Sequence, residues 1–305
     1  MLRPLVRTPR ARWLPVAATL GSLLVQACTT DAPQGEPELA QRLASAVSQA
    51  YPDRTVRIAD PGEVVVTDPD GTEQRMFLNN LRAGCLDAPE DCDALIARQV
   101  GSLGDIAAMD APTAAQLRPI LKDASYLAEV DRITGQADTP ELVAASRVLR
   151  RPFHGALSVL WVLDMPDSMG MVSQSTLDDL GLSQEAMEAR ALDNLVACCS
   201  ELPVQPVEGV PGVFQMWVGD SYEAARLLLH QAWAPLVETV PGGLVAVAPS
   251  REVVLFTGSE DSMGKQALAT AAQGISESAY GLEPVLLLWT PLGWQALDPA
   301  GAGTP

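Results

Sequence analysis

The amino-acid sequence predicts an α+β fold, in which mixed and mostly antiparallel sheets pack against helices. Three observations point to this class. Short β-branched segments separated by strong turn sequences fall between residues 55 and 78. Apolar side chains recur at helical spacing in several segments, and two nearly unbroken apolar runs in the second half are typical of buried strands. We expect a small N-terminal α/β-meander part and a larger C-terminal α+β part.

The N-terminal part is predicted to begin with an amphipathic helix. Its apolar positions, three or four residues apart, are Leu39, Leu43, Val47 and Ala50. Three strands should follow, because Asp-Pro-Gly and Asp-Pro-Asp-Gly sequences between them favour turns. These strands are predicted at residues 55–59, 63–67 and 73–78. Helical segments are expected between residues 79 and 103, and a further strand at residues 117–121.

The C-terminal part shows stronger patterns, led by the apolar run from Ala156 to Leu163. Ser183 can cap a helix that extends to Ser200, since a serine oxygen accepts a hydrogen bond from a free amide of the first turn. Further strands are predicted at residues 213–218, 244–248, 253–257 and 285–289. Further helices are predicted at residues 221–240, where a proline interrupts the pattern, and at residues 263–279.

A polar stretch with Gly135 and Pro140 indicates a boundary between the two parts. The expected divisions are a small α+β region at residues 38–133, a linker at 134–147, an α+β domain at 148–298 and a disordered tail at 299–305. Each of the two folded parts would be long enough to enclose a core.

The first residues have the three regions of a bacterial export signal in the usual order. Four arginines precede an uncharged apolar run at residues 13–25. The Val-Gln-Ala-Cys sequence that ends at Cys28 resembles a lipobox, which predicts a signal peptide at residues 1–27 and a lipid on Cys28. The two alternatives are an ordinary thiol after a plain signal peptide and an uncleaved anchor helix.

A lipid on Cys28 would attach the chain to a membrane of the bacterial cell envelope, through a flexible tether at residues 28–37. Thr29, rather than an acidic residue, follows the cysteine, which favours the outer membrane in an envelope that has two. The expected partners are therefore the membrane and an unknown envelope protein or small ligand.

The acidity of the chain excludes one class of partner. The sequence has 38 acidic and 20 basic residues, which gives a net charge of −18. Loss of the four arginines of the signal peptide would leave 16 basic residues and a charge of −22. Such a surface repels phosphate backbones, so we expect no nucleic acid among the partners. We interpret the acidity mainly as a source of solubility.

Four cysteines lie beyond the expected signal peptide and lipobox, in a compartment expected to be oxidising. The six residues between Cys85 and Cys92 include a proline and three acids, which suggests a turn that brings the pair together. We predict this disulfide. Cys198 and Cys199 are adjacent in a predicted helix, where successive side chains diverge, and we expect core residues rather than a bonded pair. Zinc is not expected, because the sequence has no Cys-x-x-Cys motif and contains only two histidines that could add nitrogen ligands.

Four segments of the chain resemble the YtpQ-like family, a family of unknown function. They are Asp164-Met-Pro-Asp-Ser-Met169, Leu180-Gly-Leu-Ser183, Asp220-Ser-Tyr-Glu-Ala-Ala-Arg226 and Val245-Ala-Val-Ala-Pro249. The resemblance extends from Glu38 to Leu297, is densest after Ala156, and implies a mixed α+β fold with no established activity. The chain differs from the family in having Ser221 where members have glycine, and a lipid anchor that many members lack. It is interpreted as an exported lipoprotein version.

The candidate binding residues are polar side chains near the ends of predicted strands and helices. They are Asp164, Asp167, Asp220, Tyr222, Arg226 and Arg251. The carboxylates could act as a paired acid and base or hold a cation, and Arg226 could bind an anionic ligand. In the structural interpretation, which we favour, the aspartates bond to nearby backbone and Arg226 pairs with Asp220 or Glu223.

No catalytic residue, metal or cofactor is predicted. The Gly-Asp-Ser sequence ending at Ser221 matches the nucleophile block of one esterase class, but the spacing to His230 does not bring a base to the hydroxyl. Phosphate-binding loops and dinucleotide fingerprints are absent from the sequence. We favour a non-enzymatic envelope lipoprotein that binds a protein or small ligand. The alternatives are a structural component of an envelope assembly and a hydrolase that uses Asp164, Asp167 or Asp220.

Overall fold

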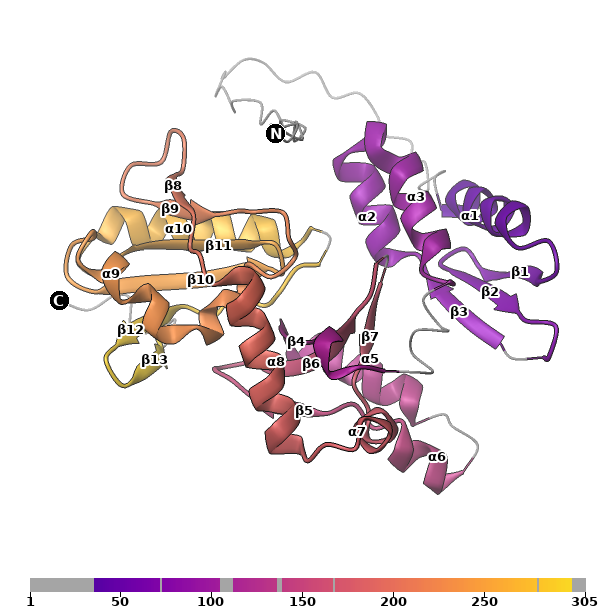
Figure 1. Ribbon diagram of the computed structural model, residues 1–305. Helices are drawn as coiled ribbons and strands as arrows, with labels where there is room; N and C mark the ends of the chain where they lie inside the picture. Colours follow the sequence, from indigo (N-terminus) through magenta and orange to yellow (C-terminus); the bar gives the residue numbers. More distant parts are fainter. Residues whose placement is uncertain are drawn as a thin grey trace, which may run out of the picture. The chain divides into compact units, whose positions relative to one another are not determined.

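The computed structural model describes residues 36–71, 73–104, 112–135, 139–166, 168–278 and 280–297. These residues belong to one of the two units into which the chain divides, Gly35–Pro305. Helices pack on three sheets whose paired strands are antiparallel (Figure 1), which confirms the predicted α+β class. The expected signal peptide, the lipid site at Cys28, Asp167 and the expected tail lie outside the described residues.

The N-terminal part is a three-stranded meander with helices packed on it. Its elements are α1 (Glu36–Ala50), β1 (Thr55–Asp60), β2 (Glu63–Thr67), β3 (Glu73–Phe77), α2 (Asn79–Asp87), the 3₁₀ helix η1 (Pro89–Asp91) and α3 (Cys92–Gly101). Helix α1 packs on α3 and on β1 (Figure 1). The apolar side chains of α1, β2 and α3 enclose a core that includes Leu43, Val47, Val64, Val66 and Ile96. The predicted helix and meander are confirmed, although α1 begins at Glu36, inside the expected tether.

The disulfide predicted in this part joins α2 to the beginning of α3. The Sγ atoms of Cys85 and Cys92 lie 2.10 Å apart, at bonding distance. The two cysteines are seven residues apart in the sequence. Closing a loop of this size restricts the unfolded chain, which contributes about 2.5 kcal/mol to the free energy of unfolding. The bond therefore holds the beginning of α3 beside α2.

A second sheet has the strand order β4-β6-β5, with β7 paired to β6. This region contains the 3₁₀ helix η2 (Ala114–Gln116), β4 (Leu117–Lys122), α5 (Ala124–Thr134), α6 (Pro140–Ala145), β5 (Arg150–Pro152), β6 (Ser158–Asp164), β7 (Met169–Met171), α7 (Gln174–Leu180) and α8 (Gln184–Cys199). The Ser183 Oγ accepts a hydrogen bond from the Ala186 amide, so the predicted cap of α8 is confirmed. Helix α8 packs against β4 (Figure 1).

The expected linker at residues 134–147 does not separate two folded parts. Strand β4, which precedes this segment, pairs with β6, which follows it, from Leu117 opposite Leu163 to Lys122 opposite Ser158. The segment itself contains the end of α5 and helix α6. The predicted domain boundary was wrong because a surface connection between strands of one sheet has the same polar composition as a linker between domains.

A six-stranded sheet of order β13-β12-β10-β11-β9-β8 forms the last part, with α10 packed on β10 and β11 (Figure 1). Its elements are β8 (Val204–Pro206), β9 (Phe214–Met216), 3₁₀ helices η3 (Ala224–Leu228) and η4 (His230–Trp233), α9 (Ala234–Val237), β10 (Leu244–Ser250), β11 (Val253–Gly258), α10 (Ser262–Ser276), β12 (Leu287–Thr290) and β13 (Gly293–Ala296). The helix predicted at 221–240 is instead a series of short helical turns, because Leu229 leaves the helical conformation at φ −84° and ψ 51°.

The largest core is shared by the second and third sheets. It includes Leu117, Trp161, Trp233, Leu244, Phe256 and Trp294. Side chains alternate between the two faces of a strand, so β4 and β6 present their other residues to a second cluster. That second cluster contains Ile120, Leu160 and Val162 together with side chains from α8 and η3. The candidate site lies on this second face.

Candidate functional site

Three polar side chains share the second face of the β4–β6 sheet. Arg118 and Lys122 flank Ile120 on β4, and Asp164 ends β6 in line with Leu160 and Val162, because residues two apart point to the same side. The apolar residues between them contact Leu195 and Cys199 of α8 and Tyr222. The polar groups are therefore held at the border of a packed cluster rather than on an open surface.

Tyr222 enters this cluster from a tight turn after β9. The Gly219 and Ser221 backbones have φ values of 82° and 67°, a region that non-glycine residues seldom adopt, and the Asp220 Oδ1 accepts the Tyr222 amide at 3.0 Å. Burial, followed by the charge of nearby Asp164, raises the pKa of Tyr222. Its hydroxyl is buried next to the Asp164 carboxylate. The turn thus presents a neutral phenol to the polar edge of the sheet.

Asp220 and Arg226 form an ion pair whose guanidinium is buried and whose carboxylate is 32% exposed, as the structural interpretation of these residues expected. The guanidinium donates to both carboxylate oxygens, at 2.9 and 2.6 Å, and its Nε donates to the Glu201 carbonyl at 3.1 Å. Arg226 is only 3% exposed. Burial acts to raise the pKa of Asp220, but the bonds from Arg226 and from the Tyr222 amide hold it below its usual value. These contacts engage each of the three guanidinium nitrogens, so the pair fixes the turn.

Glu223 is a fully buried carboxyl group in the same turn, which the sequence did not single out. Its Oε1 accepts hydrogen bonds from the Val218 and Gly219 amides, while Oε2 is buried without a partner among the residues described. Burial raises the pKa of Glu223 despite these two bonds. The carboxyl group therefore acts as an internal cap for the strained backbone of the turn.

Lys122 and Arg251 place two cationic side chains near one another at the edge of the cluster. Lys122 is 8% exposed, and its Nζ lies 4.3 Å from the centre of the Tyr126 ring. Burial and the charge of Arg251 lower the pKa of Lys122 to about 8, although Asp123 opposes the shift. The Asp123 carboxylate accepts hydrogen bonds from the Tyr126 and Glu283 amides and from the Ser125 hydroxyl. Within the described ranges, Lys122 has no carboxylate at ion-pair distance.

Arg251 is held by aromatic and polar contacts at the turn between β10 and β11. Its guanidinium lies 3.9 Å from the centre of the Tyr280 ring, and one nitrogen lies 2.9 Å from the Glu252 carboxylate. Another nitrogen approaches the Met169 sulfur at 3.9 Å, which puts Arg251 beside the residue of β7 that pairs with Asp164. The Nε atom is buried and unpartnered in the part of the chain described.

The structure thus brings together three of the predicted site residues. Asp164, Tyr222 and Arg251 lie along one border of the cluster, and the Asp220–Arg226 pair supports the turn that carries Tyr222. Asp167 lies outside the described residues. Sequence reasoning missed Lys122, although one signal was available: it is one of two lysines in the chain and ends a strand of largely buried residues.

The two histidines pack against aromatic rings. The His230 ring stacks on Trp289 with centroids 5.0 Å apart, and His154 lies edge-on to Phe153 at 4.5 Å. The Gly-Asp-Ser sequence that ends at Ser221 forms the strained turn that precedes Tyr222.

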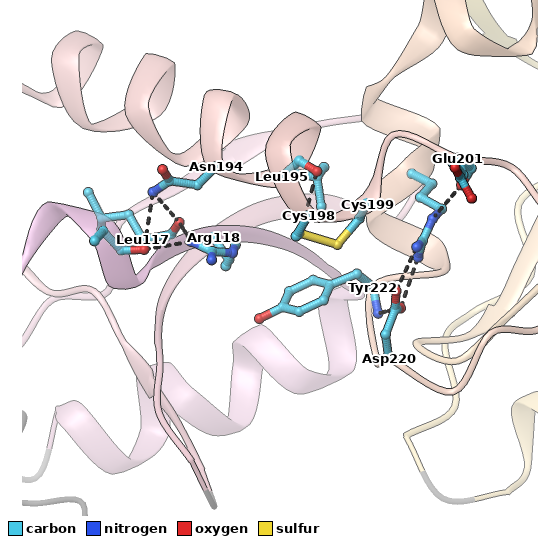
Figure 2. Close-up of a disulfide and its surroundings, with 11 residues drawn as sticks. Leu117, Arg118, Asn194, Leu195, Cys198, Cys199, Glu201, Asp220 and Tyr222 are labelled. Atoms are coloured by element: carbon cyan, nitrogen blue, oxygen red, sulfur yellow. Dashed lines mark hydrogen bonds and ion pairs between the residues drawn. A yellow bond between two sulfur atoms is a disulfide. The ribbon is translucent and has the colours of Figure 1, made fainter. Parts of the chain in front are cut away.

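The adjacent cysteines correct one prediction. Figure 2 shows the bonded sulfur atoms of Cys198 and Cys199 at the end of α8, next to the Tyr222 ring; the S–S distance is 2.07 Å. The sequence analysis expected two unbonded core residues, because successive side chains diverge inside a helix. Here the two cysteines are the last two residues of α8, at the end of the helix rather than in its interior.

Two surface hollows lie away from these residues, each of about 560 Å³. One is lined by α1 and α3, with Arg42 and Asp93 on its wall. The other is lined mainly by small apolar residues of α10 and of the segments at 155–156 and 283–286. Neither hollow contains any of the predicted binding residues.

In the part of the chain that the structure describes, the fold and the site define an α+β protein with two disulfides, an ion pair with a buried guanidinium, and a buried lysine that lies over a tyrosine ring. Among the residues described, no three His, Cys, Asp or Glu side chains are grouped to hold a metal ion. The same residues include no helix that is both long and apolar enough to cross a bilayer.

Comparison with known proteins identifies a distant relative. The chain is 27% identical over 150 residues to UPF0354 protein lin1649 of Listeria innocua, a member of an uncharacterised family. The match covers 49% of this chain and 55% of the relative, so the chain spans about half the length of the curated relative it matches. No family model and no solved structure matches the chain. The comparison supports a relationship to proteins of unknown function.

Proposed function

We propose that this chain is a YtpQ-like lipoprotein of the bacterial cell envelope, anchored by a lipid on Cys28, whose folded region binds a small oxyanion without converting it. The ligand class we infer is a carboxylate or a sulfate-like group. The single observation that supports binding is a lysine enclosed by protein and left without a carboxylate partner. Anchoring is supported by the arginine-rich start, the apolar run and the lipobox.

The anchoring proposal predicts a specific modification. Mass spectrometry of the mature protein should find a chain that begins at Cys28 and carries acyl groups, because cleavage at the lipobox makes the lipid-bearing cysteine the first residue. The lipidated chain should be found in the membrane fraction, and in the outer membrane if the envelope has two. A Cys28→Ala variant should lose the acyl groups and leave that fraction. An unmodified Met1, or a membrane-bound and fully processed Cys28→Ala chain, would contradict this part of the proposal.

Lys122 favours an anionic ligand for electrostatic reasons. A buried ammonium without a carboxylate partner is costly, and the neighbouring charge of Arg251 increases that cost. An oxyanion between the two side chains would relieve the repulsion and accept charge-assisted hydrogen bonds, which are among the stronger contacts in proteins. The rings of Tyr126 and Tyr280 hold the two cations in place for such a ligand.

The pKa of Lys122 determines how binding should depend on pH. Below about pH 8 the amine is protonated in the free protein, so the affinity should be constant; above this value it should fall as the charge is lost. Sulfate is a suitable probe, because it keeps its charge over this range. Acetate probes the carboxylate alternative at neutral pH.

The test compares two lysine variants by calorimetric titration with sulfate. Lys122→Met should weaken binding by about 10-fold or more, because one charge-assisted hydrogen bond contributes about 1.5–3 kcal/mol. Lys265→Met changes the other lysine of the chain, on α10, and should leave the affinity unchanged. Equal effects of the two substitutions would refute the site. A wild-type protein that binds neither sulfate nor acetate would refute the proposal and favour a structural role in an envelope assembly.

A further inference from the structure

The two adjacent cysteines differ sharply in their access to solvent. The Cys198 side chain is exposed, whereas Cys199 is 4% exposed and packs in the cluster that contains Leu195 and Tyr222. Cys198 is therefore the more accessible end of this bond for a thiol in solution. The position of the bond, at the last residues of α8, gives it an outer and an inner end.

Little of the folding free energy depends on this bond. A disulfide stabilises a fold mainly by closing a loop in the unfolded chain, and Cys198 and Cys199 have no residue between them. Cys85 and Cys92 do close a loop, and there the fold opposes reduction. Reduction of the Cys198–Cys199 bond would also give the new Cys198 thiol a hydrogen-bond acceptor, because its sulfur lies 3.4 Å from the Leu195 carbonyl oxygen.

We propose that Cys198–Cys199 is a thiol–disulfide exchange site that accepts two electrons from a protein dithiol, with Cys198 as the sulfur that is attacked. A thiolate of the dithiol forms a bond to the Cys198 sulfur, and the S–S bond breaks to leave Cys199 as a thiolate that takes up a proton. The second thiol of the reductant then attacks the mixed disulfide. The products are two thiols in this chain and an oxidised disulfide in the partner, so electrons and protons balance.

The test uses the full chain, in which Cys85–Cys92 is an internal reference. The protein is equilibrated with increasing ratios of reduced to oxidised dithiothreitol, quenched with iodoacetamide and digested for peptide mass analysis. The peptide with Cys198 and Cys199 should be half alkylated at a ratio about 10-fold or more below that needed for Cys85 and Cys92. Equal ratios, or earlier reduction of Cys85–Cys92, would overturn the proposal.

A matched pair of variants tests which sulfur is attacked. Cys199→Ser leaves the thiol of Cys198, and Cys198→Ser leaves the thiol of Cys199. With glutathione disulfide, the chain that retains Cys198 should form the mixed disulfide about 10-fold or more faster than the chain that retains Cys199, because only the former thiol is exposed. Equal rates would show that access does not distinguish the two sulfurs and would refute the assignment to Cys198.

Discussion

Replacement of Arg226 with methionine is expected to lower the free energy of unfolding by about 2–4 kcal/mol, because it removes the hydrogen bonds of a buried guanidinium and leaves the Asp220 carboxylate, which is 32% exposed, without its partner. Arg226 is 3% exposed and donates to both oxygens of Asp220 and to the Glu201 carbonyl. Methionine keeps much of the side-chain volume, so the loss should reflect charge and hydrogen bonds rather than a cavity. Urea denaturation, followed by circular dichroism, measures the change.

Arg150 provides a matched control for this prediction. It forms a pair of the same bidentate geometry with Asp131, with nitrogen–oxygen distances of 2.9 and 3.0 Å, but both side chains are substantially exposed. Arg150→Met should cost less than about 1 kcal/mol, because water screens an exposed pair. If the two substitutions lowered the stability equally, burial would not be the reason for the effect at Arg226.

Trp233→Ala should destabilise the protein by about 3–5 kcal/mol, because truncation of a buried aromatic side chain removes apolar contacts and leaves a cavity. Trp233 is fully buried and lies edge-on to Phe256 and Trp294, with centroids 6.0 and 5.6 Å away. Its indole Nε1 donates to the Arg226 carbonyl at 2.9 Å, so the substitution also removes a buried hydrogen bond. The same urea denaturation series measures the loss.

Trp217 allows the same substitution at a site without these contacts. It is 46% exposed in the segment after β9, so Trp217→Ala should change the free energy of unfolding by no more than about 0.5 kcal/mol. A loss at Trp217 as large as that at Trp233 would mean that the shared core of the second and third sheets does not govern stability. The comparison separates burial from residue type.

Much of the fold could be predicted from local patterns. The meander followed from β-branched segments and Asp-Pro turns, and the cap of α8 followed from Ser183, because these features act between residues close in the sequence. The expected linker at 134–147 was wrong because the pairing of β4 with β6 joins distant segments. Composition reports that a segment is on the surface, but it does not report which strands the segment connects.

The candidate site was predicted only in part, for the same reason. Asp164, Tyr222 and Arg251 stood out by residue type, but their proximity depends on the meeting of two sheets. Lys122 is not part of any recognisable sequence motif. Its unusual environment comes from burial and from the charge of Arg251, which is far from it in the sequence. The bond between Cys198 and Cys199 depends on where α8 ends, a boundary that periodicity locates only to within a few residues.

By itself, the sequence determined the α+β class, the acidic charge and the Cys85–Cys92 pairing, because composition, turns and short loops act locally along the chain. The tertiary structure alone decided which polar groups are buried, which are paired and which are left without a partner. Arg226 is neutralised by Asp220, while Lys122 is enclosed without a carboxylate. The physical reason is that burial and charge compensation are set by side chains that folding brings together from distant segments.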